Sequence, residues 1–159
     1  MSNIIYPKGG SNLDPLIKFI STHPNAKLPQ KNHKDNLTGD TGYDIFGVNE
    51  VIVPKRGSVI APVGLKLASI TPGFWFRVEP RSGLGFKSNI QPHLGVIDNQ
   101  YRGDLSIKLY NFGDEDVVLA KGVAVAQLII YKIINADMSW TDKVDKTERG
   151  EKGFGSSGI

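Results

Sequence analysis

Glycine and proline interrupt this chain so often that long helices have little room to form. Of its 159 residues, 18 are Gly and 9 are Pro. Between them lie short runs rich in β-branched and aromatic residues, which is typical of β-strands. The expected strands cover residues 51–53, 58–61, 64–68, 74–78 and 105–110. Many short strands joined by tight turns predict an all-β fold, a sandwich or jelly roll rather than alternating strands and helices.

Two further apolar runs lie outside this series. Residues 16–20 predict an edge strand, followed by a polar connection from His23 to Asn36. Residues 123–134 contain no Gly or Pro, so a helix has to be weighed against a strand there. Their many Val and Ile residues lose side-chain freedom in a helix, and this favours a buried strand.

The end of the chain differs in composition from the part before it. The last eleven residues hold four Gly and two Ser, together with Arg149 and Phe154. We expect a single all-β domain over residues 1–148 and a flexible, glycine-rich C-terminal arm over residues 149–159. The amides of such an arm can wrap a phosphate, Arg149 can neutralise it, and Phe154 can stack on a base. A disordered terminus without function is the alternative.

Composition excludes several classes of function. The chain has no Cys, which rules out disulfides, iron–sulfur clusters and a thiol nucleophile, and its three His residues are scattered. The net charge of +3 is mild, with 16 acidic residues among 19 basic ones, so no nucleic-acid partner is expected. We see no apolar stretch long enough for a membrane and no leader pattern, and therefore expect a cytoplasmic protein.

Two turn segments carry side chains that suit metal and phosphate chemistry. Residues 38–44 are a cluster of turn formers that leads into a strand, and Asp44 there either faces a metal ion or bonds its own backbone. Further on, Arg81, Ser82 and Gly83 could hold a phosphate, since guanidinium binds phosphate oxygens in pairs and Gly lets amides approach. A strand-ending turn with a solvated Arg81 is the alternative.

A third segment, residues 95–104, is typical of a hairpin tip. An apolar run delivers Asp98 into a turn, and Tyr101 follows it. A carboxylate there can orient an attacking water, the Tyr ring can pack on a sugar, and the hairpin backbone can bond to a flat base. An ordinary hairpin is the alternative. Later in the chain, Gln127 interrupts the buried strand and either satisfies nearby backbone or reaches a ligand.

In their order and spacing, these segments resemble the five motifs of the trimeric dUTP pyrophosphatases, or dUTPases. Residues 38–45 are similar to the first motif, 80–84 to the second, 95–103 to the third, 122–128 to the fourth and 149–158 to the glycine-rich fifth. The resemblance implies a distorted jelly-roll subunit of the β-clip type and a homotrimer with shared active sites. It also implies Mg²⁺-dependent hydrolysis of dUTP to dUMP and pyrophosphate, which limits uracil in DNA and supplies dUMP for dTMP synthesis. The expected compartment is the cytoplasm, that of the host if a virus encodes the chain.

The resemblance implies a role for each candidate residue. Asp98 matches the Asp that orients the water attacking the α-phosphorus, and Tyr101 matches the Tyr that packs on the deoxyribose. Backbone around Gly95 and Leu105 would bond to the uracil edge, and Phe154 would stack over the base. The residues that match phosphate-contacting positions are Arg81, Ser82, Gly83, Gln127, Arg149, Ser156 and Ser157.

The metal role in this resemblance falls on Asp44, which matches the Asp that contacts Mg²⁺ through a metal-bound water. A triphosphate brings its own oxygen ligands and Mg²⁺ keeps several waters, so a chain without a ligand cluster can still depend on this ion. The arm, residues 149–159, matches a segment that closes over an active site of another subunit.

The sequence also departs from the family pattern. Val123 and Ala124 stand where the fourth motif usually has an acidic residue and an Arg, which concerns a subunit contact rather than the chemistry, and Gly83 stands where many members have Ser. Two alternatives follow from the same fold. The related dCTP deaminases carry a catalytic Glu at the position of Lys108, which cannot act as that acid or base. A dUTP-controlled regulatory protein, whose arm orders on nucleotide binding and signals to a partner, is the other.

Overall fold

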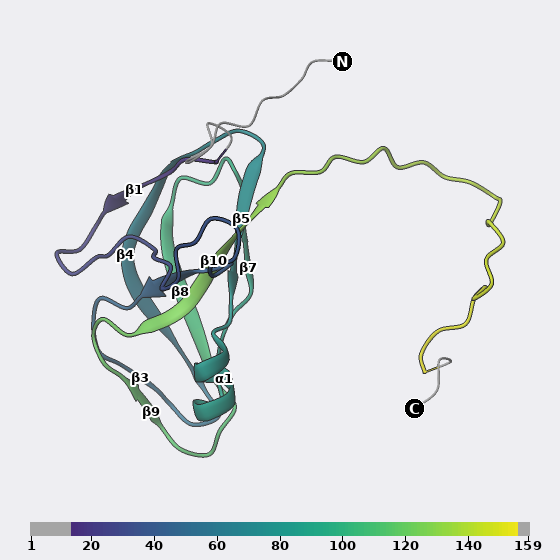
Figure 1. Cartoon of the computed structure of the whole chain (residues 1–159). Helices are drawn as coiled ribbons and strands as arrows, with labels where there is room; N and C mark the ends of the chain where they lie inside the picture. Colours follow the sequence, from purple (N-terminus) through teal and green to yellow (C-terminus); the bar gives the residue numbers. More distant parts are fainter. Residues whose placement is uncertain (1–13, 156–159) are drawn as a thin grey trace.

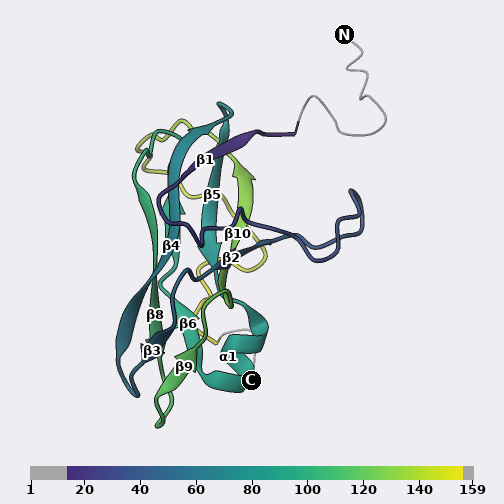
Figure 2. The same cartoon turned by 90° about the vertical axis from the view of Figure 1, so that its left-hand side faces the viewer.

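β-Strands dominate the computed structural model, which describes residues 14–155 (Figures 1 and 2). They form two facing four-stranded sheets and a two-stranded ribbon, with antiparallel pairing between neighbours. The all-β expectation is confirmed, apart from one short helix. In chain order the elements are β1 (Ile17–Ser21), β2 (Tyr43–Phe46), β3 (Val51–Val53), β4 (Ser58–Ile70), β5 (Phe74–Glu79), α1 (Ser82–Ser88), β6 (Ile90–Pro92), β7 (Gly95–Ile97), β8 (Asp104–Asn111), β9 (Val117–Leu119) and β10 (Ala124–Lys132).

The two larger sheets bury a core between them. The first has the strand order β1-β4-β8-β6 and the second β2-β10-β5-β7, while β3 and β9 form the ribbon. Along β8, Leu105, Ile107 and Leu109 are buried, whereas Ser106 and Lys108 face solvent. This is the alternation that the sequence predicts for a strand with one wet face. The largest fully buried side chains of the domain include Phe76, Ile45, Leu67, Ile90, Ile107, Leu109 and Leu128.

Two predicted strands, residues 58–61 and 64–68, are a single strand in the structure. β4 continues through Pro62 and Gly64, and its pairing with β8 shifts register between Pro62 and Lys66. Gly64 has a φ of +67°, a conformation that side-chain-bearing residues avoid. The glycine therefore forms an irregularity within one strand, where the sequence indicates a break between two.

Gly64→Ala is expected to destabilise the domain by about 2–4 kcal/mol, because it combines backbone strain with overpacking. A Cβ at this position would lie 2.8 Å from the Cβ of His23 and 3.0 Å from that of Ala26. Gly73→Ala is the matched control, since Gly73 has a φ of +88° but open space around an added Cβ within the described chain. It should lose only the backbone cost of about 1–2 kcal/mol. Urea unfolding at one protein concentration measures both, and equal losses would contradict the packing argument.

A short helix follows Arg81, where the sequence indicates either a phosphate-binding loop or a strand-ending turn. Two residues separate α1 from β5, and the helix covers seven residues, two of them Gly, so its composition does not favour a helix. It ends at Asn89, which has a φ of +55° and donates its backbone N–H to the carbonyl of Gly85 at 3.2 Å. Within the described part of the chain, no helix is long and apolar enough to span a membrane.

Residues 95–104 do not form the β-hairpin that the sequence predicts. β7 pairs with β5 in the second sheet, whereas β8 pairs with β4 and β6 in the first. The connection therefore crosses from one sheet to the other, although a turn is present in which Tyr101 donates its amide to the carbonyl of Asp98 at 3.0 Å. Local sequence signals a turn, but strand partners depend on the order of the whole sheet.

The strands predicted at the two ends of the domain are confirmed. β1 lies at the edge of the first sheet, and β10 occupies the centre of the second rather than forming a helix. Beyond β10, the amide of Ile133 donates to the carbonyl of Gly73 at 2.8 Å. The chain then leaves the sandwich in an extended arc (Figure 1). Side chains from residue 133 to residue 152 are exposed throughout.

Candidate functional site

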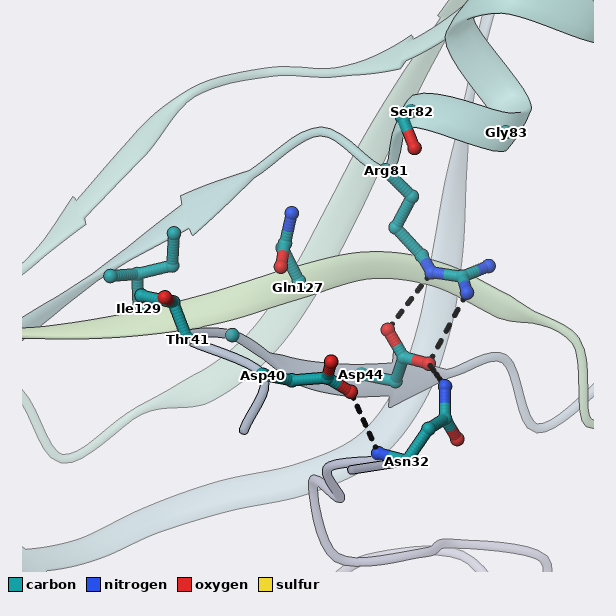
Figure 3. Close-up of a pocket in the computed structure, with 10 residues that line it drawn as sticks. Asn32, Asp40, Thr41, Asp44, Arg81, Ser82, Gly83, Gln127 and Ile129 are labelled. Carbon is teal, nitrogen blue, oxygen red and sulfur yellow. Dashed lines mark hydrogen bonds and ion pairs between the residues drawn. The ribbon is translucent and has the colours of Figure 1, made fainter. Parts of the chain in front are cut away.

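Five of the predicted site residues line one pocket of about 370 Å³ (Figure 3). Asp44 comes from β2, Gln127 from β10, and Arg81, Ser82 and Gly83 from the junction between β5 and α1. The sheet order places β2, β10 and β5 side by side, so distant segments of the sequence meet here. The structure thus gathers the segments that resemble the first, second and fourth motifs around one cavity.

Arg81 and Asp44 form a two-point ion pair at this pocket. Nε of Arg81 donates to Oδ1 of Asp44 at 2.9 Å, and Nη2 donates to Oδ2 at 3.3 Å. Nη1 also donates to the carbonyl of Ala124 at 3.4 Å. A guanidinium has five N–H groups, so two of them remain for the oxygens of a ligand. The side chains of Arg81 and Asp44 are 32% and 14% exposed, which leaves the cation accessible and the carboxylate mostly covered.

Gln127 combines the two roles that the sequence leaves open. Its Nε2 donates to the carbonyl of Pro80 at 2.8 Å, and its side chain also lines the pocket. Gly42, in the loop before β2, lies directly against it, because a Cβ at Gly42 would overlap the Gln127 amide. Glycine at this position therefore allows the loop to approach β10 closely.

The polar loop before β2 contributes a residue that the sequence does not single out. Asn32 donates from Nδ2 to Oδ2 of Asp44 at 3.3 Å. Two contacts place it there: Gln30 pairs with Asp44 through their backbones, and Oδ2 of Asp40 accepts the amides of Asn32 and His33 at 3.1 and 3.0 Å. No motif signals this arrangement, because it depends on the loop folding back on β2. The remaining lining residues are Asp40, Thr41, Gly42 and Ile129.

The loop is expected to respond to pH, because the carboxylate of Asp40 accepts hydrogen bonds from its backbone amides. The backbone amide of His33 lowers the pKa of Asp40 below the usual 3.8, assisted by the His33 side chain and the amide of Asn32. A lowered pKa means that the carboxylate stabilises the loop above pH 3.8 and that this contribution is lost as the pH falls through the lowered value. In an NMR titration, we expect the amide shifts of Asn32 and His33 to move with a midpoint below 3.8, and not to move so in Asp40→Asn. A midpoint at or above 3.8 would contradict the hydrogen-bond geometry.

The residues predicted to hold the water and the nucleoside lie on and beside the connection from β7 to β8. Asp98 is exposed, and the neighbouring Asn99 anchors the turn by donating from Nδ2 to the carbonyl of Thr71 at 3.0 Å and to that of Phe74, the first residue of β5, at 2.9 Å. Tyr101 is 41% exposed, and its hydroxyl donates to the first carbonyl of β8 at 2.7 Å. Gly95 begins β7, and Leu105 lies in β8 with its side chain buried.

These residues are too far from the pocket to join it within one chain. β2 forms one edge of the second sheet, and Asp98 follows β7 at the opposite edge. Ile97 of β7 pairs with Phe76, which pairs with Ile130, three residues along β10 from Gln127. With about 4.8 Å between strands and about 3.3 Å per residue, Ile97 lies on the order of 14 Å from Gln127. One chain therefore holds the predicted site as two separate halves.

In the described part of the arm, residues 149–155, the hydrogen bonds of Arg149 and Gly150 are local. Nε of Arg149 donates to the carbonyl of Lys152 at 2.7 Å, and the amide of Gly150 donates to the hydroxyl of Thr147 at 3.0 Å. Phe154 is fully exposed. The predicted phosphate ligands Ser156 and Ser157 lie outside the described residues.

The chemistry of the pocket suits a phosphate that arrives with its own metal. Among residues 14–155, no group of three or more His, Cys, Asp or Glu side chains could hold a metal ion alone. The pocket presents the guanidinium of Arg81, the carboxylates of Asp40 and Asp44, and the side-chain amides of Asn32 and Gln127. A guanidinium binds phosphate oxygens, and a single carboxylate can accept hydrogen bonds from the waters around Mg²⁺.

Comparison with known proteins agrees with this geometry. The family model described as dUTPase matches residues 29–158. A deoxyuridine 5'-triphosphate nucleotidohydrolase of Oryza sativa subsp. japonica is 39% identical over 145 residues, covering 91% of this chain and 82% of its own. The corresponding protein of Fowl adenovirus A serotype 1 is 36% identical over 159 residues, covering 99% of this chain and 86% of its own. A solved structure of Staphylococcus bacteriophage 80alpha dUTPase with dUpNHpp superposes with a TM-score of 0.76 and 26% identity, covering 91% of this chain and 99% of that one. The chain belongs to the dUTPase family, whose members hydrolyse dUTP.

Proposed function

We propose that this dUTPase cleaves dUTP to dUMP and pyrophosphate at sites shared between copies of the chain in a homotrimer. The observation that carries the proposal is the separation of the Arg81 pocket from Asp98 across the second sheet. Both halves are accessible, and each lacks what the other provides. A second copy that brings its Asp98 to the pocket of the first would complete the site.

In this proposal the pocket holds the triphosphate. Arg81 has two free N–H groups for phosphate oxygens, and Ser82, Gly83 and Gln127 add a hydroxyl, a backbone amide and a side-chain amide. The positive charge of Arg81 would stabilise the negative charge that accumulates on the departing pyrophosphate. The dUTPase family uses Mg²⁺, and in this proposal Asp44 would accept hydrogen bonds from the water shell of the ion. Bound Mg²⁺ would supply further neutralisation of the triphosphate charge.

The second half of the site supplies the attacking water and selects the nucleoside. Asp98 would accept a hydrogen bond from the water and align it with the α-phosphorus, so that an O–P bond forms as the bond to the pyrophosphate oxygen breaks. Tyr101 would pack on the deoxyribose and leave no room for a 2′-hydroxyl. Backbone groups near Gly95 and Leu105 would bond to the uracil edge. Asp98 and Tyr101 both lie on the connection from β7 to β8. The hydrogen bonds of Asn99 anchor this connection and so hold the two side chains in position relative to each other.

The segment between β10 and the arm supports assembly with other copies. From residue 134 to residue 144, nearly every second side chain is apolar, and polar residues stand between them. This is the pattern of a strand with one apolar face, yet the segment is exposed along its length. Its large exposed side chains are Ile134, Met138, Trp140 and Val144. A strand of this kind is stable when a sheet of another copy covers it, and this would carry the arm, residues 149–159, to another subunit's site.

Measuring product release from four nucleotides tests the proposal. With Mg²⁺, the protein is expected to release pyrophosphate rapidly from dUTP and only slowly from dTTP, dCTP and UTP, and EDTA should stop the reaction. Ammonia from dCTP would indicate a deaminase instead, and dUTP binding without turnover would indicate a regulatory protein.

The molar mass in solution tests the assembly. A monomer at micromolar concentration that turns over dUTP would contradict shared sites.

A further inference from the structure

We infer that Asn32 is a positioning residue that holds the Asp44 carboxylate in place for the Mg²⁺–nucleotide complex. The inference rests on the proposed function, in which Asp44 accepts hydrogen bonds from the water shell of the ion. Asn32 lies in the polar loop before β2, outside every segment that resembles a dUTPase motif. Figure 3 shows its side-chain amide directed at the Asp44 carboxylate, on the side away from Gln127.

Three donors define the orientation of this carboxylate. Oδ1 accepts from Nε of Arg81 at 2.9 Å, while Oδ2 accepts from Nη2 of Arg81 and from Nδ2 of Asn32, each at 3.3 Å. A carboxylate has about four lone-pair positions, so these bonds leave room for a metal-bound water. Asn32 is neutral, and it therefore orients Asp44 without cancelling the charge that attracts the cation.

The contact from Arg81 and the contact from Asn32 differ in what happens when phosphate binds. Arg81 is the pocket cation, and phosphate bound to its two remaining N–H groups draws the guanidinium toward the ligand and shares the charge that holds Asp44. The amide of Asn32 is not drawn toward the ligand in the proposal, because it faces the carboxylate from the loop. As the hold of Arg81 on Asp44 weakens, Asn32 remains to keep the carboxylate directed into the pocket.

The loop is built to fix Asn32 itself. Gln30 and Asp44 exchange two backbone hydrogen bonds, from Gln30 N to Asp44 O at 3.1 Å and from Asp44 N to Gln30 O at 2.6 Å. On the other side of Asn32, Asp40 accepts the amides of Asn32 and His33 and donates its own amide to the His33 carbonyl at 2.9 Å. Anchors on both sides restrict the backbone of Asn32, so its side chain needs little ordering to reach Asp44.

The test measures how far Mg²⁺ strengthens binding of dUpNHpp, the analogue found in the phage enzyme structure, by calorimetry. In Asn32→Ala, we expect the strengthening by Mg²⁺ to fall about tenfold relative to the wild type, with the affinity in EDTA unchanged within about twofold. Asn32→Leu keeps about the size of the side chain and removes the donor without adding charge, so a loss of similar size is expected. Asn36→Ala is the matched control: Asn36 is exposed in the same loop, and its change should alter neither value.

The outcomes separate this inference from the proposed function. If Asp44→Ala abolishes the effect of Mg²⁺ while both Asn32 variants keep it, the Asn32 inference is wrong and the metal role of Asp44 stands. If Asp44→Ala keeps the effect, the metal role itself is wrong. Equal weakening of binding with Mg²⁺ and in EDTA, accompanied by a lower melting temperature, would mean that Asn32 serves only the loop structure.

Discussion

Asp98→Asn is expected to lower the turnover of dUTP by about 10²–10⁴-fold while leaving the affinity for dUpNHpp within a few-fold of the wild type. The amide keeps the size of the carboxylate but accepts a proton far less readily, so the water loses its base. Asp98 is exposed and its turn is anchored by Asn99, so the change should not disturb folding. Single-turnover kinetics and calorimetry measure the two quantities separately. Near-normal turnover would remove Asp98 from the proposed mechanism.

The same variant also tests whether the two halves of a site come from different copies. Arg81→Gln removes the pocket cation and is expected to be nearly inactive on its own. If the two variants are unfolded and refolded together in equal amounts, about one quarter of the sites should combine an intact Arg81 with an intact Asp98. Recovery of about that fraction of wild-type activity is therefore expected. Mixing without refolding is the control, and no recovery after verified co-assembly would place both halves in one chain.

Ending the chain after Glu148 is expected to lower turnover on the order of 100-fold, since the arm would supply phosphate donors and exclude water from the closed site. The melting temperature should change little, because the described part of the arm is exposed and its hydrogen bonds are local. Differential scanning calorimetry and pyrophosphate release measure the two effects. Full activity of the shortened chain would contradict a role for the arm in catalysis.

Phe154→Ala separates the stacking role of the arm from its phosphate role. Loss of a ring that stacks on a base costs about 1–3 kcal/mol, and since the arm would also supply phosphate donors, we expect a loss of turnover at the lower end of this range, on the order of 10-fold. The ring is fully exposed in this structure, so its removal should leave stability unchanged. An effect on turnover as large as that of the full truncation would mean that Phe154 carries the role of the whole arm.

The sequence predicts those parts of the fold that depend on local alternation. The inward Leu and Ile residues of β8 are an example, because burial on one face leaves a period-two pattern. The strand over β10 is predicted in another way, by its many β-branched residues. The sequence predicts α1 poorly, since two of its seven residues are Gly and the helix depends on its surroundings. The partners of β7 also escape prediction, because they are decided by the order of the sheet rather than by the turn at residues 98–101.

The candidate site shows the same division. Chemistry-bearing side chains such as Asp44, Arg81 and Asp98 can be recognised by type and spacing, and the structure brings the first two within hydrogen-bond distance. Asn32 cannot be recognised in this way, since an Asn in a polar loop is ordinary and its contact depends on the backbone bridge from Gln30 and on the bonds of the loop to Asp40. The distance between Asp98 and the pocket is likewise a property of the sheet and has no local signature.

The Arg81 pocket and Asp98 lie toward opposite edges of one sheet, so in the proposed trimer a chain folds first and becomes active only later, when it assembles. A newly made chain can bury its core and complete its pocket alone, because both belong to one sandwich. In the proposed trimer it cannot hydrolyse dUTP until it meets other copies. Activity per chain would then rise with total enzyme concentration, and dilution would switch the enzyme off without unfolding it. A slow subunit exchange would make this loss gradual, and it would be reversed when the chains are concentrated again.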